Sequence, residues 1–133
     1  MTGRTVLVVD DDDEIREITS LALELMGGWH VTSTDRGATC LTLAREQRPS
    51  VILLDVMMPE MDGPTTFLRL QQDPSTRHIP VILLTAKARV GDTQCWDGLD
   101  VAGVISKPFN PATLSDEVDR MVEEHVGHSR LSA

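Results

Sequence analysis

The chain has 133 residues, 21 of them acidic and 12 basic, so its formal net charge at pH 7 is -9. This length is typical of one domain, and a hydrophobic content of 41% allows a core that needs no disulfide or metal. The acidity argues against direct nucleic-acid binding or attachment to anionic membranes, and two cysteines make no disulfide framework, so we expect a cytoplasmic protein. Its apolar runs are too short to span a bilayer, and the N-terminal residues lead straight into a strand pattern without the features of a signal peptide.

Five short apolar runs rich in β-branched residues predict strands, each followed by a stretch with helical character. In chain order the runs are Thr5–Val9, Trp29–Ser33, Val51–Leu54, Val81–Leu84 and Val101–Ile105. The third and fourth runs are continuously apolar, as expected of strands that are covered on both faces.

The first intervening segment has apolar residues at helical spacing, namely Ile15, Ile18, Ala22, Leu25 and Met26. This stripe predicts a helix that ends at Gly27-Gly28. Four more helices are predicted: one through Leu41 and Ala44 that ends before Pro49, one capped by Asp62 with Pro64 in its first turn, one around residues 89–99, and one from Leu114 to Val126 that ends at Gly127.

Alternating strands and helices imply an α/β fold: a doubly wound parallel sheet with right-handed crossovers and helices on both faces. In such sheets ligands bind outside the carboxyl ends of the strands. We therefore expect one site to collect the polar residues that follow the first, third, fourth and fifth strands. These are Asp10, Asp11, Asp55, Thr85 and Lys107.

This constellation of residues suits phosphoryl chemistry. Crowded carboxylates either take up protons or attract a cation, and an all-oxygen site of this size suits Mg²⁺. A neighbouring hydroxyl and ammonium can hold further negative charge, which predicts a site that places a phosphoryl group on or near an aspartate. Helix capping explains the acids at 12–14, but it does not explain Asp10, Asp11 or the residues that end the other strands.

Four segments together resemble the CheY-like receiver domain of bacterial two-component response regulators. They are Val8-Val9-Asp10-Asp11, Leu54-Asp55-Val56-Met57-Met58-Pro59-Glu60-Met61-Asp62-Gly63, Leu84-Thr85-Ala86 and Ser106-Lys107-Pro108-Phe109. The resemblance covers residues 4–126 and leaves 127–133 as a short polar tail. It implies a flavodoxin-like five-stranded sheet with the strand order 2-1-3-4-5.

By the same resemblance, Asp55 is the phosphoacceptor and receives its phosphoryl group from a histidine of a sensor kinase or a histidine phosphotransfer protein. Asp11 would bind Mg²⁺ (or Mn²⁺) directly and Asp10 mainly through water. Asp55 and the backbone carbonyl of Met57 would complete the metal ligands.

The resemblance also implies that Thr85 bonds a phosphoryl oxygen, that Lys107 pairs with the phosphoryl group, and that the Lys107–Pro108 bond is cis. Phosphorylation would change the surface formed by the helix around 89–99, the strand at 101–105 and the last helix, and so control a downstream protein. Such a domain is a switch that catalyses only its own phosphorylation and dephosphorylation. The five strand–helix units use almost all of the chain, so we expect no output domain.

Three positions depart from the common pattern or tune it. Val104 stands where many receivers have an aromatic residue that moves on activation, and we expect it to pack as an ordinary strand residue. Met57 and Lys87 are hypothesised to control the access of water to the phosphoryl group.

Four alternative functions fit the sequence less well. A phosphohydrolase resembling the haloacid dehalogenases needs a second aspartate two residues after the nucleophile, where this chain has Met57. A flavodoxin-like electron carrier needs a glycine- and hydroxyl-rich phosphate loop where this chain has Asp10–Asp13, and a Ca²⁺ loop needs a glycine and a distal glutamate that residues 10–14 lack. A receiver that signals without phosphorylation is disfavoured because all five site residues are present.

Overall fold

Five parallel strands form the centre of the molecule in the computed structural model, which describes residues 4–86 and 98–132. In chain order the strands are β1 (Thr5–Val9), β2 (His30–Thr34), β3 (Val51–Asp55), β4 (Val81–Thr85) and β5 (Gly103–Ser106). They lie in the order β2-β1-β3-β4-β5. The predicted fold class and strand order are therefore confirmed, and each strand boundary lies within two residues of its prediction.

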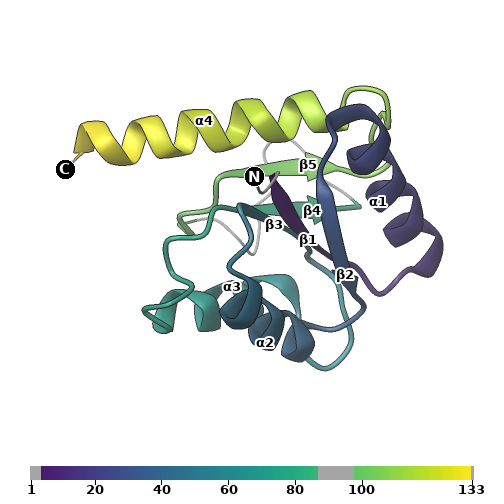
Figure 1. Ribbon diagram of the computed structural model, residues 1–133. Helices are drawn as coiled ribbons and strands as arrows, with labels where there is room; N and C mark the ends of the chain where they lie inside the picture. The colour runs from purple at the N-terminus through teal and green to yellow at the C-terminus, as the bar shows by residue number, and fades with distance from the viewer. Residues whose placement is uncertain (1–3, 87–97, 133) are drawn as a thin grey trace.

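The helices cover both faces of the sheet (Figure 1). They are α1 (Asp13–Gly27), α2 (Gly37–Gln47), α3 (Gly63–Gln72) and α4 (Leu114–Ser132). Helices α2 and α3 lie together on one face, and α1 and α4 lie on the other. The helix predicted around residues 89–99 lies outside the described residues, apart from its last two positions. Among the helices of the described ranges, none combines the length and apolar character that crossing a membrane requires.

Alternate residues of the strands supply the two halves of the core. Leu7 and Val9 of β1 pack with residues of α2 and α3, whereas Val6 and Val8 pack with residues of α1 and α4. All residues of β3 and β4 are buried, because helices cover both faces of the sheet there. The two central strands therefore end in buried polar residues, Asp55 and Thr85, at the same edge.

The predicted apolar stripe of α1 is partly wrong. The helix buries Thr19, Ala22 and Leu23, whereas Leu25 is 78% exposed and Ile18 48% exposed. Thr19 can occupy the buried face because its hydroxyl donates to the backbone carbonyl of Ile15 at 2.6 Å, which satisfies the polar group within the helix. The apolar residues alone therefore predict a buried face that is rotated about the axis of α1 from the observed one.

Two glycines predicted as helix ends behave differently. Gly28 adopts a left-handed conformation with φ of 65° and donates its N–H to carbonyls of the last turn of α1, so the predicted end is confirmed. Gly127 is not among the residues with positive φ, and α4 continues through it to Ser132. The predicted end of this helix is therefore wrong. Glycine in a helix costs about 1 kcal/mol relative to alanine, which does not by itself end a helix.

Trp29 was predicted to start the second strand but belongs to the end of α1. Its backbone N–H donates to the carbonyl of Leu23 at 3.2 Å. Its buried indole donates to Oγ of Ser115 at 3.0 Å, which connects the end of α1 to the start of α4.

Candidate functional site

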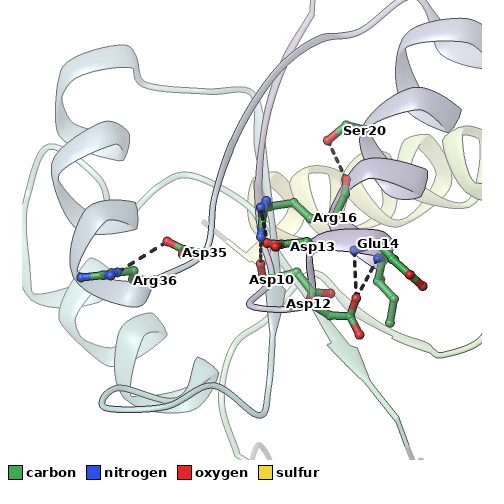
Figure 2. Close-up of polar contacts among 9 residues, drawn as sticks. Asp10, Asp12, Asp13, Glu14, Arg16, Ser20, Asp35 and Arg36 are labelled. Atoms are coloured by element: carbon green, nitrogen blue, oxygen red, sulfur yellow. Dashed lines mark hydrogen bonds and ion pairs between the residues drawn. The ribbon is translucent and has the colours of Figure 1, made fainter.

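The acidic segment after β1 contains two kinds of carboxylate (Figure 2). Asp12 is the N-cap of α1, because its Oδ1 accepts from the N–H groups of Glu14 and Ile15 at 3.0 and 3.1 Å. Asp10 is fully buried, and its Oδ1 accepts from the N–H of Asp12 at 2.9 Å. Capping therefore accounts for Asp12 and leaves Asp10 in the interior of the site.

Lys107 joins the ends of three strands. Its Nζ lies 2.8 Å from Oδ2 of Asp10 and 3.1 Å from Oδ1 of Asp55. Its backbone N–H donates to the carbonyl of Thr85 at 2.7 Å, and the Lys107–Pro108 peptide bond is cis, as the resemblance implied. The ammonium is thus held between two carboxylates in a pocket where its side chain is 12% exposed.

The electrostatics of the site favour a proton or a cation at Asp55. Burial, together with the negative charge of Asp10, raises the pKa of Asp55 from 3.8 to about 6, although Lys107 acts in the opposite direction. Burial alone would lower the pKa of Lys107, but its hydrogen bonds to Asp10 and Asp55 and their charges outweigh burial and raise it. Lys107 therefore stays charged, and one ammonium does not fully offset the carboxylates around it.

Three carboxylates at this edge could bind a divalent cation together. Asp10, Asp11 and Asp55 each offer an oxygen, and these oxygens all lie within 4.8 Å of one another. Asp11 is exposed, whereas the other two are buried. Hard oxygen donors of this number and charge fit Mg²⁺, which binds through one or two carboxylates and keeps several waters.

The remaining residues that the sequence singled out are Thr85, Met57, Val104 and Lys87. Leu84 is opposite Asp55 in the sheet register, so Thr85 lies one residue further toward the carboxyl edge, and it is buried. Met57 follows β3 and is 73% exposed, and the role of its carbonyl as a metal ligand stays a prediction. Val104 packs against the core beside α2 and α3. Lys87 lies outside the described residues.

Gly63 also shapes the site, a role that the sequence pattern does not indicate. Its N–H donates to the carbonyl of Val56 at 2.9 Å, and this bond folds the segment after β3 back over the strand. A Cβ at this position would lie 2.4 Å from the carbonyl oxygen of Asp55, so only glycine allows the close approach. Its place directly after the N-cap Asp62 was visible in the sequence, but the contact with Asp55 was not.

A mainly apolar groove of about 440 Å³ lies beside Lys107. It is lined by Ile15, Ile18, Ala86, Lys107, Pro108, Phe109 and Pro111. The groove adjoins the carboxylate site because Lys107 is part of both.

Comparison with known proteins identifies a single family. The family profile described as the response regulator receiver domain matches residues 6–119. The chain is 41% identical over 108 residues to the probable transcriptional regulatory protein TcrX of Mycobacterium tuberculosis, covering 80% of this chain and 44% of TcrX. It is 46% identical over 112 residues to the response regulator PleD of Caulobacter vibrioides, covering 82% of this chain and 24% of PleD. The chain thus spans about half or less of the length of these relatives.

Solved structures give the same result. The chemotaxis response regulator CheY4 of Vibrio cholerae superposes with a TM-score of 0.82 at 31% identity, over 90% of this chain and 99% of CheY4. The receiver domain of the sensor histidine kinase PA1611 of Pseudomonas aeruginosa, whose structure has a magnesium ion coordinated in the active site cleft, superposes with a TM-score of 0.81 at 28% identity. That match covers 92% of this chain and 99% of the PA1611 domain.

Proposed function

The chain belongs to the family of response regulator receiver domains, and from this premise we propose that Asp55 accepts a phosphoryl group in a reaction that depends on Mg²⁺ or Mn²⁺. The donor is a phosphohistidine of a sensor histidine kinase or a histidine phosphotransfer protein. The observation that supports this most strongly is the placement of Asp55. Its buried carboxylate lies 3.1 Å from the ammonium of Lys107 and within 4.8 Å of the oxygens of Asp10 and Asp11.

Each site residue has a role in the proposed transfer. An oxygen of Asp55 attacks phosphorus, the phosphorus–nitrogen bond to the donor histidine breaks, and its electron pair stays on the imidazole nitrogen. With a pKa of about 6, Asp55 is largely ionised at neutral pH and can act as the nucleophile. Lys107 pairs with a phosphoryl oxygen, and the hydroxyl of Thr85 donates to another. A bound Mg²⁺, held by Asp10, Asp11, Asp55 and the carbonyl of Met57, would offset the charge of the phosphoryl oxygens.

The groove beside Lys107 supports the proposal that the phosphoryl donor is a histidine on another protein. A phosphohistidine on another protein must bring its phosphorus to Asp55 past the surface around that residue, and this groove adjoins the site through Lys107. Its apolar side chains, Ile15, Ile18 and Phe109, can bury part of the donor surface. We place the proposed encounter there.

The output of the switch is a changed protein surface. The proposed surface consists of the helix around 89–99, β5 and α4; of these, β5 and α4 lie in the described residues. Between them lies a groove that includes Val104, Glu117, Arg120 and Met121, which offers apolar and charged groups to a downstream protein.

The net charge of -9 supports a domain that does not itself contact nucleic acid. Buried Cys40, a free thiol, suits the cytoplasm.

The domain is proposed to act on itself and not as an enzyme on other substrates. A phosphohydrolase that uses an aspartyl phosphate needs a second group that can give and take protons near the nucleophile. Two residues after Asp55 this chain has the thioether of Met57, which cannot transfer a proton. Sustained turnover of small phosphate esters would contradict this part of the proposal.

Mass spectrometry of the intact protein after incubation with acetyl phosphate tests the central claim. We expect a mass gain of one phosphoryl group that requires Mg²⁺ and is lost in Asp55→Asn. Asp100→Asn, which removes an exposed carboxylate before the start of β5, at the opposite end of that strand from Lys107, should be labelled like the wild type. If Mg²⁺ produces no mass gain in the wild type, or if Asp55→Asn is labelled equally, the proposed function is wrong.

A further inference from the structure

All the polar atoms of Asp10 have hydrogen-bond partners. Its N–H donates to the carbonyl of Thr34 at 3.1 Å, its Oδ1 accepts from Asp12, and its Oδ2 accepts from Lys107. The remaining atom, the backbone carbonyl oxygen, accepts from Nη1 of Arg16 at 2.8 Å. A fully buried residue held at each polar atom has little freedom to reorient.

Arg16 bridges the acidic loop and the first turn of α1 (Figure 2). While Nη1 donates to the carbonyl of Asp10, Nη2 donates to Oδ1 of Asp13 at 2.6 Å. The side chain is 21% exposed, so most of its surface is shielded from solvent. A planar guanidinium presents its donors in a fixed fork, and the arginine therefore fixes the carbonyl of Asp10 relative to the helix.

This contact matters because the carbonyl of Asp10 belongs to the peptide plane that joins Asp10 to Asp11. Asp11 is the exposed member of the three-carboxylate cluster, and burial does not hold its side chain in place. We infer that Arg16 is a positioning residue for the divalent cation site: it fixes this peptide plane and thereby aims the carboxylate of Asp11 at the cation. The inference rests on the proposed metal-dependent function.

The positive charge of Arg16 by itself weakens cation binding, whereas its positioning of Asp11 strengthens it. The guanidinium of Arg16, whose Nη1 lies 2.8 Å from the backbone carbonyl oxygen of Asp10, adds positive charge beside the acidic loop and so weakens the attraction of its carboxylates for a cation. If Arg16 acted only through its charge, its removal would tighten cation binding. If it acts by positioning Asp11, its removal weakens cation binding in spite of the lost positive charge. The sign of the change therefore separates the two roles.

The test is a titration with Mn²⁺, in which the electron paramagnetic resonance signal of the free ion gives the dissociation constant without any phosphorylation. We expect Arg16→Gln to bind Mn²⁺ about tenfold more weakly than the wild type, the size of effect seen when groups that orient metal ligands are removed. Arg45→Gln is the matched control. It makes the same change in net charge at an ion pair between α2 and Asp73, the C-cap of α3, and it should leave the dissociation constant within about twofold of the wild type.

Arg16→Lys separates geometry from charge, because lysine keeps the charge but lacks the fork that reaches both acceptors. Weaker binding in this variant supports positioning, and it decides the question if Arg16→Gln does not fold, as judged by thermal unfolding in EDTA. A folded Arg16→Gln that binds Mn²⁺ as tightly as the wild type, or more tightly, overturns the role of Arg16 and leaves the proposed function intact. If the wild type itself does not bind Mn²⁺, the proposed metal site fails, and the role of Arg16 with it.

Discussion

The carboxylate of Asp55 is buried and lies near both a positive and a negative charge. Among the residues that the structure describes, its carboxylate pairs with the ammonium of Lys107, which also pairs with Asp10. Burial and the charge of Asp10 therefore raise its pKa to about 6. A carboxyl whose pKa is higher in the folded chain than in the unfolded chain destabilises the folded state whenever it is ionised. This destabilisation is absent below about pH 4, grows as the pH rises, and is complete above about pH 6.

Asp55→Asn should therefore stabilise the metal-free protein at pH 7.5. The difference between the ordinary pKa of 3.8 and about 6 corresponds to a gain in unfolding free energy of at most about 3 kcal/mol. Urea unfolding in EDTA measures it. The gain should shrink as the pH is lowered toward 4, and Asp100→Asn should show no comparable gain. Equal stabilisation at pH 4 and pH 7.5 would mean that ionisation of Asp55 is not its cause.

Single residues of the site differed in how well the sequence predicted their positions. Asp10, Asp55 and Lys107 were placed together because each follows a strand, and parallel strands end at one edge of the sheet. Arg16 and Gly63 could not be found in that way. Arg16 acts through a side chain that folds back along its own helix, and Gly63 acts through the path of a loop, neither of which the pattern of apolar residues encodes.

At the scale of elements, the loop between β3 and α3 depends on Gly63. Gly63→Ala would bring a Cβ within 2.4 Å of the carbonyl oxygen of Asp55, so the loop or the strand end must move. We expect a loss of about 1–3 kcal/mol in unfolding free energy, as for other overpacked sites. We also expect slower labelling of Asp55 by acetyl phosphate, because the acceptor carboxylate is displaced with its backbone. Urea unfolding and the rate of mass gain measure the two effects.

Gly127→Ala is the control for this substitution. A Cβ at Gly127 would meet no atom within 4 Å, and the residue lies inside α4. Alanine there should stabilise the helix by about 0.5–1 kcal/mol and leave the labelling rate unchanged. If Gly63→Ala proved as stable as the wild type, the close approach to Asp55 would not need a glycine.

The helices were predicted less accurately than the strands, for a physical reason. The strands β3 and β4 are buried along their whole length, so a run of apolar residues marks them directly, as in Val51–Asp55. A helix that packs on one face is defined by which residues share that face. In α1, the buried Thr19 hides part of the face and the exposed Leu25 suggests a false one. The spacing of apolar residues therefore predicted that α1 exists and that it ends at Gly28, but it did not predict which face of the helix is buried.

At the scale of the whole molecule, the sheet brings the ends of four strand units to one edge while the helices bury both faces. The net charge of -9 makes the folded chain repel itself, and the repulsion is strongest where carboxylates gather. A cation bound by Asp10, Asp11 and Asp55 requires the folded arrangement, because Asp55 is far from the other two residues in the sequence. Mg²⁺ should therefore stabilise the folded state by mass action.

Thermal unfolding with and without Mg²⁺ tests this linkage. A cation that binds only the folded chain stabilises it by about 2.7 kcal/mol at a concentration one hundred times its dissociation constant. Protons compete for the same oxygens at Asp55, whose pKa is about 6, so the rise in Tm should be large at pH 8 and small at pH 5. The rise should be mostly lost in Asp11→Asn, which leaves the buried carboxylates in place. Sodium chloride of equal ionic strength corrects for general screening of the acidic surface. If the rise in Tm with Mg²⁺ survives in Asp11→Asn at both pH values, the stabilisation comes from carboxylates outside this site.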